Sequence, residues 1–114
     1  MMTWEEKLKM YKEKERFIEV LSGVFQTTKH NSTVEGITYE VYTRPIKVND
    51  ELITEVREYV VVHFIGGGKS PRFVSGNSNI ANFRVLGEML NGGYYSEVRT
   101  YDSLIENGHQ KVDL

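Results

Sequence analysis

The run YVVVHFI at residues 59–65 is the most apolar stretch of this 114-residue chain, and it constrains the fold more than any other feature. β-branched and aromatic side chains in a row favour a strand over a helix. We therefore expect a longer strand over residues 53–65, with this run at the centre of a sheet. A central strand needs neighbours on both edges, and other segments of the chain supply candidates.

Several of these segments have the alternation of half-buried strands. Residues 37–44 alternate apolar and polar side chains, and Pro45 either ends this strand or places it at a sheet edge. Residues 49–50, Asn and Asp, predict a turn into the central strand. Residues 72–74 can form a short third strand as an antiparallel hairpin, and residues 94–101 alternate again as a last strand.

Two helices are expected beside these strands. Thr3 and Glu6 form a capping box at the start of the first helix, and Gly23 is a suitable stop. A second helix follows the amides and hydroxyl at residues 77–79 and ends at residues 91–93. The first helix carries two apolar lines, formed by Trp4, Leu8, Tyr11, Ile18 and Leu21 and by Met10, Phe17 and Val24; the second helix carries Ile80, Phe83, Leu86 and Leu90 on one face.

The order of these elements defines the fold class. We predict one α+β ligand-binding domain over residues 1–114, with an antiparallel sheet of about four strands, a long N-terminal helix and a second helix before the last strand. The tail after Ile105 is expected to be frayed. The two apolar lines of the first helix have two interpretations: core packing with a few exposed groups, or a subunit interface.

Composition excludes several classes of protein. The chain contains no Cys, so it has no disulfides and no thiolate metal site. No apolar run approaches the roughly 18 to 20 residues that cross a bilayer. A net charge of −2 argues against general nucleic-acid binding. We expect a cytoplasmic protein with neither a membrane nor a nucleic acid as its partner.

The stretch GGGKSPRFVSGNSNIANFR at residues 66–84 combines groups that suit a nucleotide. Glycines free backbone N–H groups, cations attract phosphate, and an aromatic ring can stack on a base. A nucleoside triphosphatase loop is unlike this stretch, because His63 stands where that loop has its first glycine and Pro71 follows the Lys-Ser pair. The other interpretation of the glycines is a flexible hairpin loop.

Four side chains are candidate ligand-binding residues, two of them in this stretch. Phe73 offers a flat stacking surface if it points outward, and core packing is the alternative. Asn82 has poor helix propensity, and its amide can donate to and accept from a base edge or a ribose hydroxyl. Arg99 can stack on a base or bind a phosphate, or it forms a cross-strand ion pair. Arg16 on the first helix is a weaker candidate of the same kind.

Catalysis has no comparable support in the sequence. The histidines His30, His63 and His109 fall into no catalytic or metal-ligating spacing, and no serine has an adjacent base. For His63 we expect a strand position at the sheet edge or facing solvent. We predict no catalytic residue, no metal site and no cofactor, and hence a binding protein rather than an enzyme.

Three segments resemble a known family: YVVVHF at residues 59–64, NIANFR at residues 79–84 and GGYYSEVR at residues 92–99. Together with the order of helix, antiparallel sheet and helix, they are similar to the phage proteins of the first Thoeris anti-defence family, which sequester the cyclic ADP-ribose signal of a bacterial immune system. In that family an aromatic residue and an arginine sandwich the base, while an asparagine and further arginines hold the ribose and phosphates. The resemblance implies these roles for Phe73, Asn82, Arg99 and Arg16, with Arg72 as the alternative to Phe73.

The resemblance implies a sponge that binds a cyclic ADP-ribose isomer, or a cyclic oligonucleotide, without cleaving it. It also implies an infected bacterial host cell as the location. Because sites shared between subunits would use the surplus apolar surface of the first helix for assembly, we expect a homodimer or higher even oligomer. The competing hypothesis is a phage protein-interaction inhibitor that blocks a host enzyme by surface contact, and a third is a small hydrolase or transferase acting on nucleotides. In the interaction hypothesis the contact residues would be Tyr39, Tyr42, Tyr94, Tyr95 and Tyr101.

Overall fold

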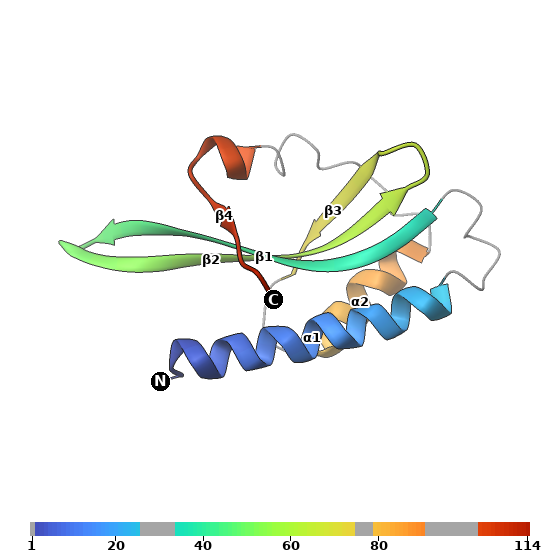
Figure 1. Ribbon diagram of the computed structural model, residues 1–114, viewed down its shortest axis with the longest axis horizontal. Helices are drawn as coiled ribbons and strands as arrows, with labels where there is room; N and C mark the ends of the chain where they lie inside the picture. Colours follow the sequence, from blue (N-terminus) through green and yellow to red (C-terminus); the bar gives the residue numbers. More distant parts are fainter. Residues whose placement is uncertain (1, 26–33, 75–78, 91–102) are drawn as a thin grey trace.

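A computed structural model of the chain describes residues 2–25, 34–74, 79–90 and 103–114 (Figure 1). The four described strands form one antiparallel sheet in the order β3-β2-β1-β4. The predicted α+β class, with a four-stranded antiparallel sheet, an N-terminal helix and a helix before the last strand, is confirmed. The elements are α1 (Trp4–Phe25), β1 (Val34–Val48), β2 (Glu51–Phe64), β3 (Lys69–Phe73), α2 (Asn79–Leu90) and β4 (Gln110–Lys111).

β1 and β2 form a long hairpin around the predicted two-residue turn. Asn49 and Asp50 have positive φ angles of 49° and 64°. Positive φ at both central residues is the type I′ geometry, whose twist matches that of an antiparallel strand pair. The turn sets a register in which Tyr42 opposes Arg57. Every side chain of the hairpin is thereby assigned to one face of the sheet.

β1 continues through Pro45 to Val48, so the edge position is the correct alternative for this proline. Proline has no N–H to donate to a neighbouring strand. On the far side of β1 from β2, β4 pairs only with Tyr42 and Thr43. Among the described residues, no strand neighbour therefore requires a donor at Pro45.

The glycine run forms the turn of the second hairpin, between β2 and β3. Gly66 and Gly67 have φ angles of 103° and 96°, a region that residues with a Cβ rarely adopt. The Phe64 N–H donates to the Gly68 carbonyl at 2.8 Å, and the Gly67 N–H donates to the Phe64 carbonyl at 3.1 Å. The glycines thus form a hairpin turn, and β2 is an inner strand of the sheet as predicted.

α1 and α2 cover one face of the sheet, which we call the helix-covered face (Figure 1). The predicted cap is confirmed, since the Thr3 hydroxyl oxygen accepts a hydrogen bond from the Glu6 N–H at 3.1 Å. Met10 and Phe17, from the second apolar line of α1, also pack against the core within the chain. The main core consists of Tyr11 and Ile18 of α1, Val85 and Leu86 of α2, Val74, and the sheet residues Val34, Ile37, Tyr39, Val41, Val60 and Val62.

A buried ion pair joins α1 to β2. Lys14 Nζ lies 2.8 Å from Glu58 Oε1, and Lys14 is only 2% exposed. The Tyr39 hydroxyl donates to the same carboxylate oxygen, and burial together with this hydrogen bond raises the Tyr39 pKa. Tyr39 therefore remains a donor to Glu58. Because a buried charge is stable only with partners, these three side chains fix the position of α1 on the sheet.

The C-terminal segment, residues 103–114, begins on the opposite face of the sheet, which we call the outer face, and then runs along β1 (Figure 1). At its end, Val112 and Leu114 pack against the main core. Leu104, in a helical turn over residues 103–106, forms a second core with Tyr42, Tyr59 and Val61. The expectation of a frayed tail after Ile105 is therefore wrong. The strand predicted over residues 94–101 lies outside the described residues, and β4 is the last strand of the described sheet.

α2 is turned so that part of its apolar surface faces outward. Ile80 and Phe83 are 80% and 62% exposed, whereas Asn82, Val85 and Leu86 are buried. The prediction that Ile80 and Phe83 belong to the apolar face that packs in the core is therefore wrong. None of the described helices combines the length and the apolar character that crossing a membrane would require.

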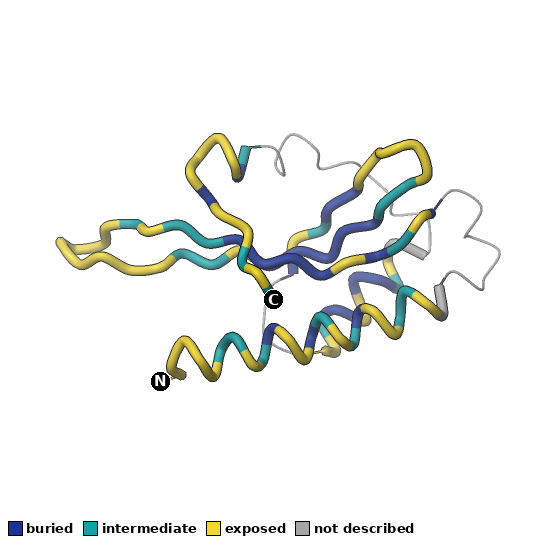
Figure 2. Tube along the Cα trace, in the orientation of Figure 1, coloured by how far each residue is buried: buried dark blue, intermediate teal, exposed yellow. Residues whose placement is uncertain are grey.

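The end of the β1–β2 hairpin projects beyond the helices as an arm, residues 44–56 (Figures 1 and 2). The molecule measures 51 × 28 × 21 Å as a consequence. Most of the arm is exposed, including large apolar side chains at its tip. These are Val48, Leu52 and Ile53, which are 43%, 73% and 43% exposed.

We expect Lys14→Met to lower the free energy of unfolding by about 3 kcal/mol, because it leaves the Glu58 carboxylate buried without its cation. Lys12→Met is the matched control, since Lys12 lies exposed on the same helix. The control should change the free energy by less than about 0.5 kcal/mol. Urea unfolding followed by circular dichroism measures both. Equal, small effects of the two variants would contradict a structural role for the ion pair.

Candidate ligand-binding site

Phe73 lies on the outer face of the sheet and is 45% exposed. It pairs with Tyr59 across β3 and β2, and the two rings meet edge to face with their centroids 5.8 Å apart. The Arg57 guanidinium carbon lies 5.8 Å from the centroid of the Phe73 ring. The outward alternative for Phe73 is therefore correct. A supported, exposed ring beside a guanidinium is an arrangement on which a planar ligand can stack.

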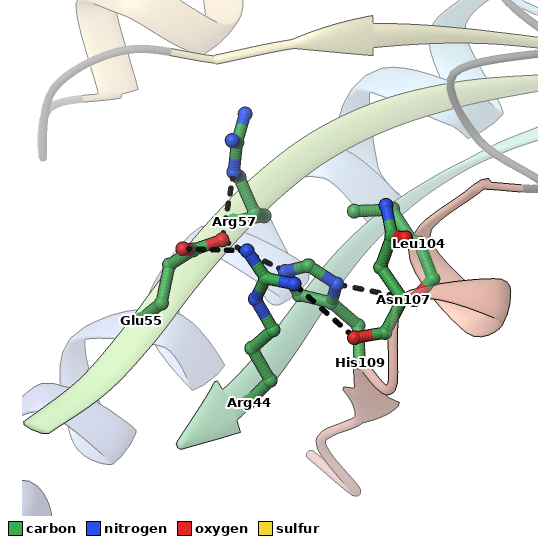
Figure 3. Close-up of polar contacts among 6 residues, drawn as sticks. All are labelled: Arg44, Glu55, Arg57, Leu104, Asn107 and His109. Atoms are coloured by element: carbon green, nitrogen blue, oxygen red, sulfur yellow. Dashed lines mark hydrogen bonds and ion pairs between the residues drawn. The ribbon is translucent and has the colours of Figure 1, made fainter. Parts of the chain in front are cut away.

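A carboxylate on the same strand holds Arg57 in place (Figure 3). Arg57 Nε lies 3.3 Å from Glu55 Oε1, and His109 Nε2 lies 2.8 Å from the same oxygen. The other oxygen, Glu55 Oε2, lies 3.3 Å from Arg44 Nη2. Arg44 also donates from Nη1 to the backbone oxygen of Asn107 at 3.2 Å. One carboxylate thus links β1, β2 and the C-terminal segment.

These contacts lower the pKa of Glu55 to about 2. The hydrogen bond with His109 is the largest cause; burial acts in the opposite direction, and the hydrogen bonds from Arg57 and Arg44 add to the lowering. Glu55 is therefore ionised at neutral pH, and it accepts from all three neighbours.

A second polar cluster occupies the outer face at β1. Glu40, only 4% exposed, accepts hydrogen bonds from the Tyr42 hydroxyl at 2.7 Å and the Thr38 hydroxyl at 2.8 Å. Thr38 Oγ1 also lies 2.7 Å from His63 Nε2. Burial lowers the pKa of His63, and Glu40 opposes that shift. His63 lies on the inner strand β2 and is partly exposed, so of the two expected alternatives the solvent-facing one applies rather than the sheet edge.

Asn82 lies on the inner side of α2, toward the helix-covered face. It is 0% exposed, and within the described part of the chain neither its amide nitrogen nor its amide oxygen has a hydrogen-bond partner. A buried polar group in this state costs about 1–3 kcal/mol. Arg72 lies on the same side of the sheet, with its Nη2 3.4 Å from Glu88 Oε2 of α2.

The predicted ligand-binding residues do not converge on one point of a single chain. Phe73 lies on the outer face, whereas Asn82 and Arg72 lie on the helix-covered face. Arg16 lies on the exposed side of α1. Arg99 is outside the described residues.

Two hollows lie along β1. One, of about 250 Å³, lies between α1 and the C-terminal segment and includes Glu15 and Lys111 in its lining. The other, of about 480 Å³, lies where the arm meets the C-terminal segment and includes Arg44 and Thr54. Of the predicted ligand-binding residues that the structure describes, none lines either hollow.

Three functional candidates on the outer face were not predicted from the sequence: Arg57, Glu55 and His109. The sequence contains a pattern that could have identified two of them. The predicted turn at Asn49 and Asp50 aligns Arg44 with Glu55 and places Arg57 two residues further along the same face. His109 had no such local signal, because it reaches Glu55 across 54 positions of the chain.

Comparisons with protein-family models, with curated proteins and with solved structures gave no match for this chain. A functional interpretation therefore depends on the residues described above and on the resemblance of the three short segments. Of those segments, residues 59–64 and 79–84 are described by the structure, in β2 and α2.

Asn82→Leu should raise the free energy of unfolding of the ligand-free protein by about 1–2 kcal/mol, because it replaces an unpaired buried amide with an apolar group of similar shape. Asn82→Asp should lower it, since it buries a carboxylate at the same place. Urea unfolding of the two variants beside the wild type measures both effects. A marked loss of stability in Asn82→Leu would show that the amide is paired in solution.

Stability in acid should depend on Glu55. Its pKa is about 2 in the folded chain against an ordinary value of 4.5, so the ionised carboxylate stabilises the fold above that ordinary value. This stabilisation is lost as the pH falls from 4.5 toward 2. Glu55→Gln should therefore lose stability less steeply over this range than the wild type, measured by urea unfolding at each pH. Glu51→Gln, at the exposed arm tip, is the control and should follow the wild type.

Proposed function

We propose that the chain is a phage immune-evasion sponge, which binds a cyclic nucleotide signal and holds it without cleaving it. The observation that carries this proposal is the exposed Phe73 ring with the Arg57 guanidinium 5.8 Å from its centroid. A base stacked on an aromatic side chain gains about 1–3 kcal/mol. A guanidinium can stack on the base or bind a phosphate. These are the interactions that a compact, anionic, planar ligand requires.

The ring and the guanidinium are held in position before a ligand arrives. Tyr59, which is 1% exposed, supports the edge of Phe73 and packs in turn against Tyr42. Glu55 anchors Arg57 through its Nε. Preorganised groups lose less conformational entropy on binding, which supports the tight binding that sequestration needs.

The resemblance of three segments to the first Thoeris anti-defence family supports a cyclic ADP-ribose isomer as the ligand. The same resemblance supports action in the cytoplasm of an infected bacterium. A cyclic oligonucleotide presents the same chemistry, a planar base joined to phosphate, and belongs to the same class of ligand. Arg99 and Arg16 keep their proposed roles in binding phosphate.

We further propose that the complete site lies between subunits of a homodimer or higher even oligomer. Phe73 is on the opposite side of the sheet from Arg72, so both can contact one ligand only if different chains supply them. Ile80 and Phe83 expose apolar surface on α2, beside the buried Asn82, and such a surface suits packing against another subunit.

The arm supports a second candidate function, inhibition of a host enzyme by surface contact. Leu52 is 73% exposed at the projecting tip, and exposed apolar groups of this kind suit a protein interface. Two tyrosines expected to make such contacts, Tyr39 and Tyr42, are buried and cannot do so. The other three, Tyr94, Tyr95 and Tyr101, lie outside the described residues.

Cyclic ADP-ribose isomers should raise the melting temperature of the wild type, and Phe73→Ala should abolish this shift because it removes the stacking surface. Trp4→Ala is a closely matched control. Trp4 is 44% exposed and also meets a buried tyrosine edge to face, with ring centroids 6.3 Å apart. It should retain the full ligand shift. The melting temperature of ligand-free Phe73→Ala should stay close to that of the wild type.

The ligand recovered after heat denaturation distinguishes the classes of function. A sponge returns the cyclic nucleotide intact, whereas an enzyme returns a product. If neither cyclic ADP-ribose isomers nor cyclic di- and trinucleotides shift the melting temperature, the sponge proposal fails. Leu52→Ala would then test the inhibitor proposal, because it should weaken capture of a host enzyme while leaving the fold intact.

A further inference from the structure

The ring of His109 makes two hydrogen bonds, and both partners are acceptors (Figure 3). Its Nδ1 lies 3.1 Å from the backbone oxygen of Leu104, and its Nε2 lies 2.8 Å from Glu55 Oε1. A carbonyl oxygen and an ionised carboxylate can only accept, whereas a neutral imidazole has a single N–H. Only the protonated ring therefore satisfies both contacts. The side chain is 3% exposed, so water has little access to either nitrogen.

The charged groups around His109 come from two strands. β2 contributes Glu55 and Arg57, and β1 contributes Arg44, which also ties down the backbone oxygen of Asn107. With a protonated His109, this cluster contains three cations and one carboxylate. Loss of the His109 proton removes one cation from the cluster and leaves one of the two acceptors without a donor from this ring.

Two routes connect His109 to the Phe73 ring. The first passes through Glu55 Oε1, which also binds Arg57 Nε at 3.3 Å, and from the Arg57 guanidinium to the ring. The second passes through the C-terminal segment, because Leu104 packs with Tyr59 and Tyr59 supports Phe73. The protonation of His109 therefore affects both the charge beside the ring and the packing beneath it.

We propose that the proton on His109 regulates the stacking site at Phe73 and Arg57, an inference that rests on the function proposed above. The protonated ring fastens the C-terminal segment to the sheet and adds positive charge beside Arg57. Both effects favour a bound anion. Opening of the segment frees the ring to release its proton, so closure takes up a proton and is favoured at lower pH. Affinity for the anion should therefore be weaker at high pH than at low pH.

The first test uses the ligand-free protein. Nitrogen-15 NMR of the histidine rings at about pH 5.5 and about pH 8 should show two protonated nitrogens on His109 at the lower pH. Amide hydrogen exchange over residues 103–112, corrected for the intrinsic effect of pH, should show greater protection at the lower pH. A singly protonated His109 ring in the closed protein at the lower pH would overturn the proposal.

The second test measures affinity for cyclic ADP-ribose at the same two pH values. Its diphosphate stays fully ionised throughout, so a change in affinity reports on the protein. The wild type should bind roughly three- to tenfold more weakly at the higher pH, the effect expected of one unit charge in a partly solvated site. His109→Gln, which has a donor and an acceptor but no titratable group, should show no such change. His63→Gln, at the other described histidine of the outer face, should keep the wild-type dependence.

The outcomes separate the regulation from the function. If the wild type binds equally well at both pH values while Phe73→Ala does not bind, the regulation is wrong and the sponge proposal stands. If cyclic ADP-ribose binds at neither pH, the regulation of its binding is overturned together with the proposed ligand. The NMR measurement needs no ligand, so it tests the protonated ring independently of both results.

Discussion

The register of the β1–β2 hairpin determines what the rest of the chain can contact. Because Asn49 and Asp50 fill a two-residue turn, even-numbered residues of β1 share a face with odd-numbered residues of β2 over most of the pair. A slip by one residue would turn Glu58 away from Lys14 and turn Tyr59 toward the helices. The ion pair beneath α1 and the aromatic cluster on the outer face therefore depend on the same alignment.

The two faces of the sheet use polar groups in different ways. On the helix-covered face, Lys14 and Glu58 neutralise each other in the core, whereas the Asn82 amide is buried without a described partner. On the outer face, the charge of Glu55 orients Arg57 beside a ring that packing leaves exposed. The first arrangement stabilises the fold, and the second prepares a surface for a ligand.

Sequence patterns predicted the parts of the fold that depend on neighbours along the chain. Strand alternation, the Thr3 cap, and the turn at Asn49 all involve contacts within a few residues or one hairpin. The C-terminal segment was missed because its attachment is through His109 and Glu55, which no local pattern connects. The face that α2 turns toward the core was also predicted wrongly. Apolar periodicity places polar side chains toward solvent, whereas Asn82 is buried.

The arm has a consequence for how the protein meets other chains. Among the described residues, its two strands pair only with each other beyond Thr43 and Glu58, so both outer edges offer backbone groups to an incoming strand. Pro45 supplies no donor on one edge, and Lys47 and Glu51 place charges near the tip. Another strand therefore cannot pair continuously along the β1 edge of the arm, which disfavours fibril growth. The β2 edge of the arm is better able to accept a short strand from another molecule.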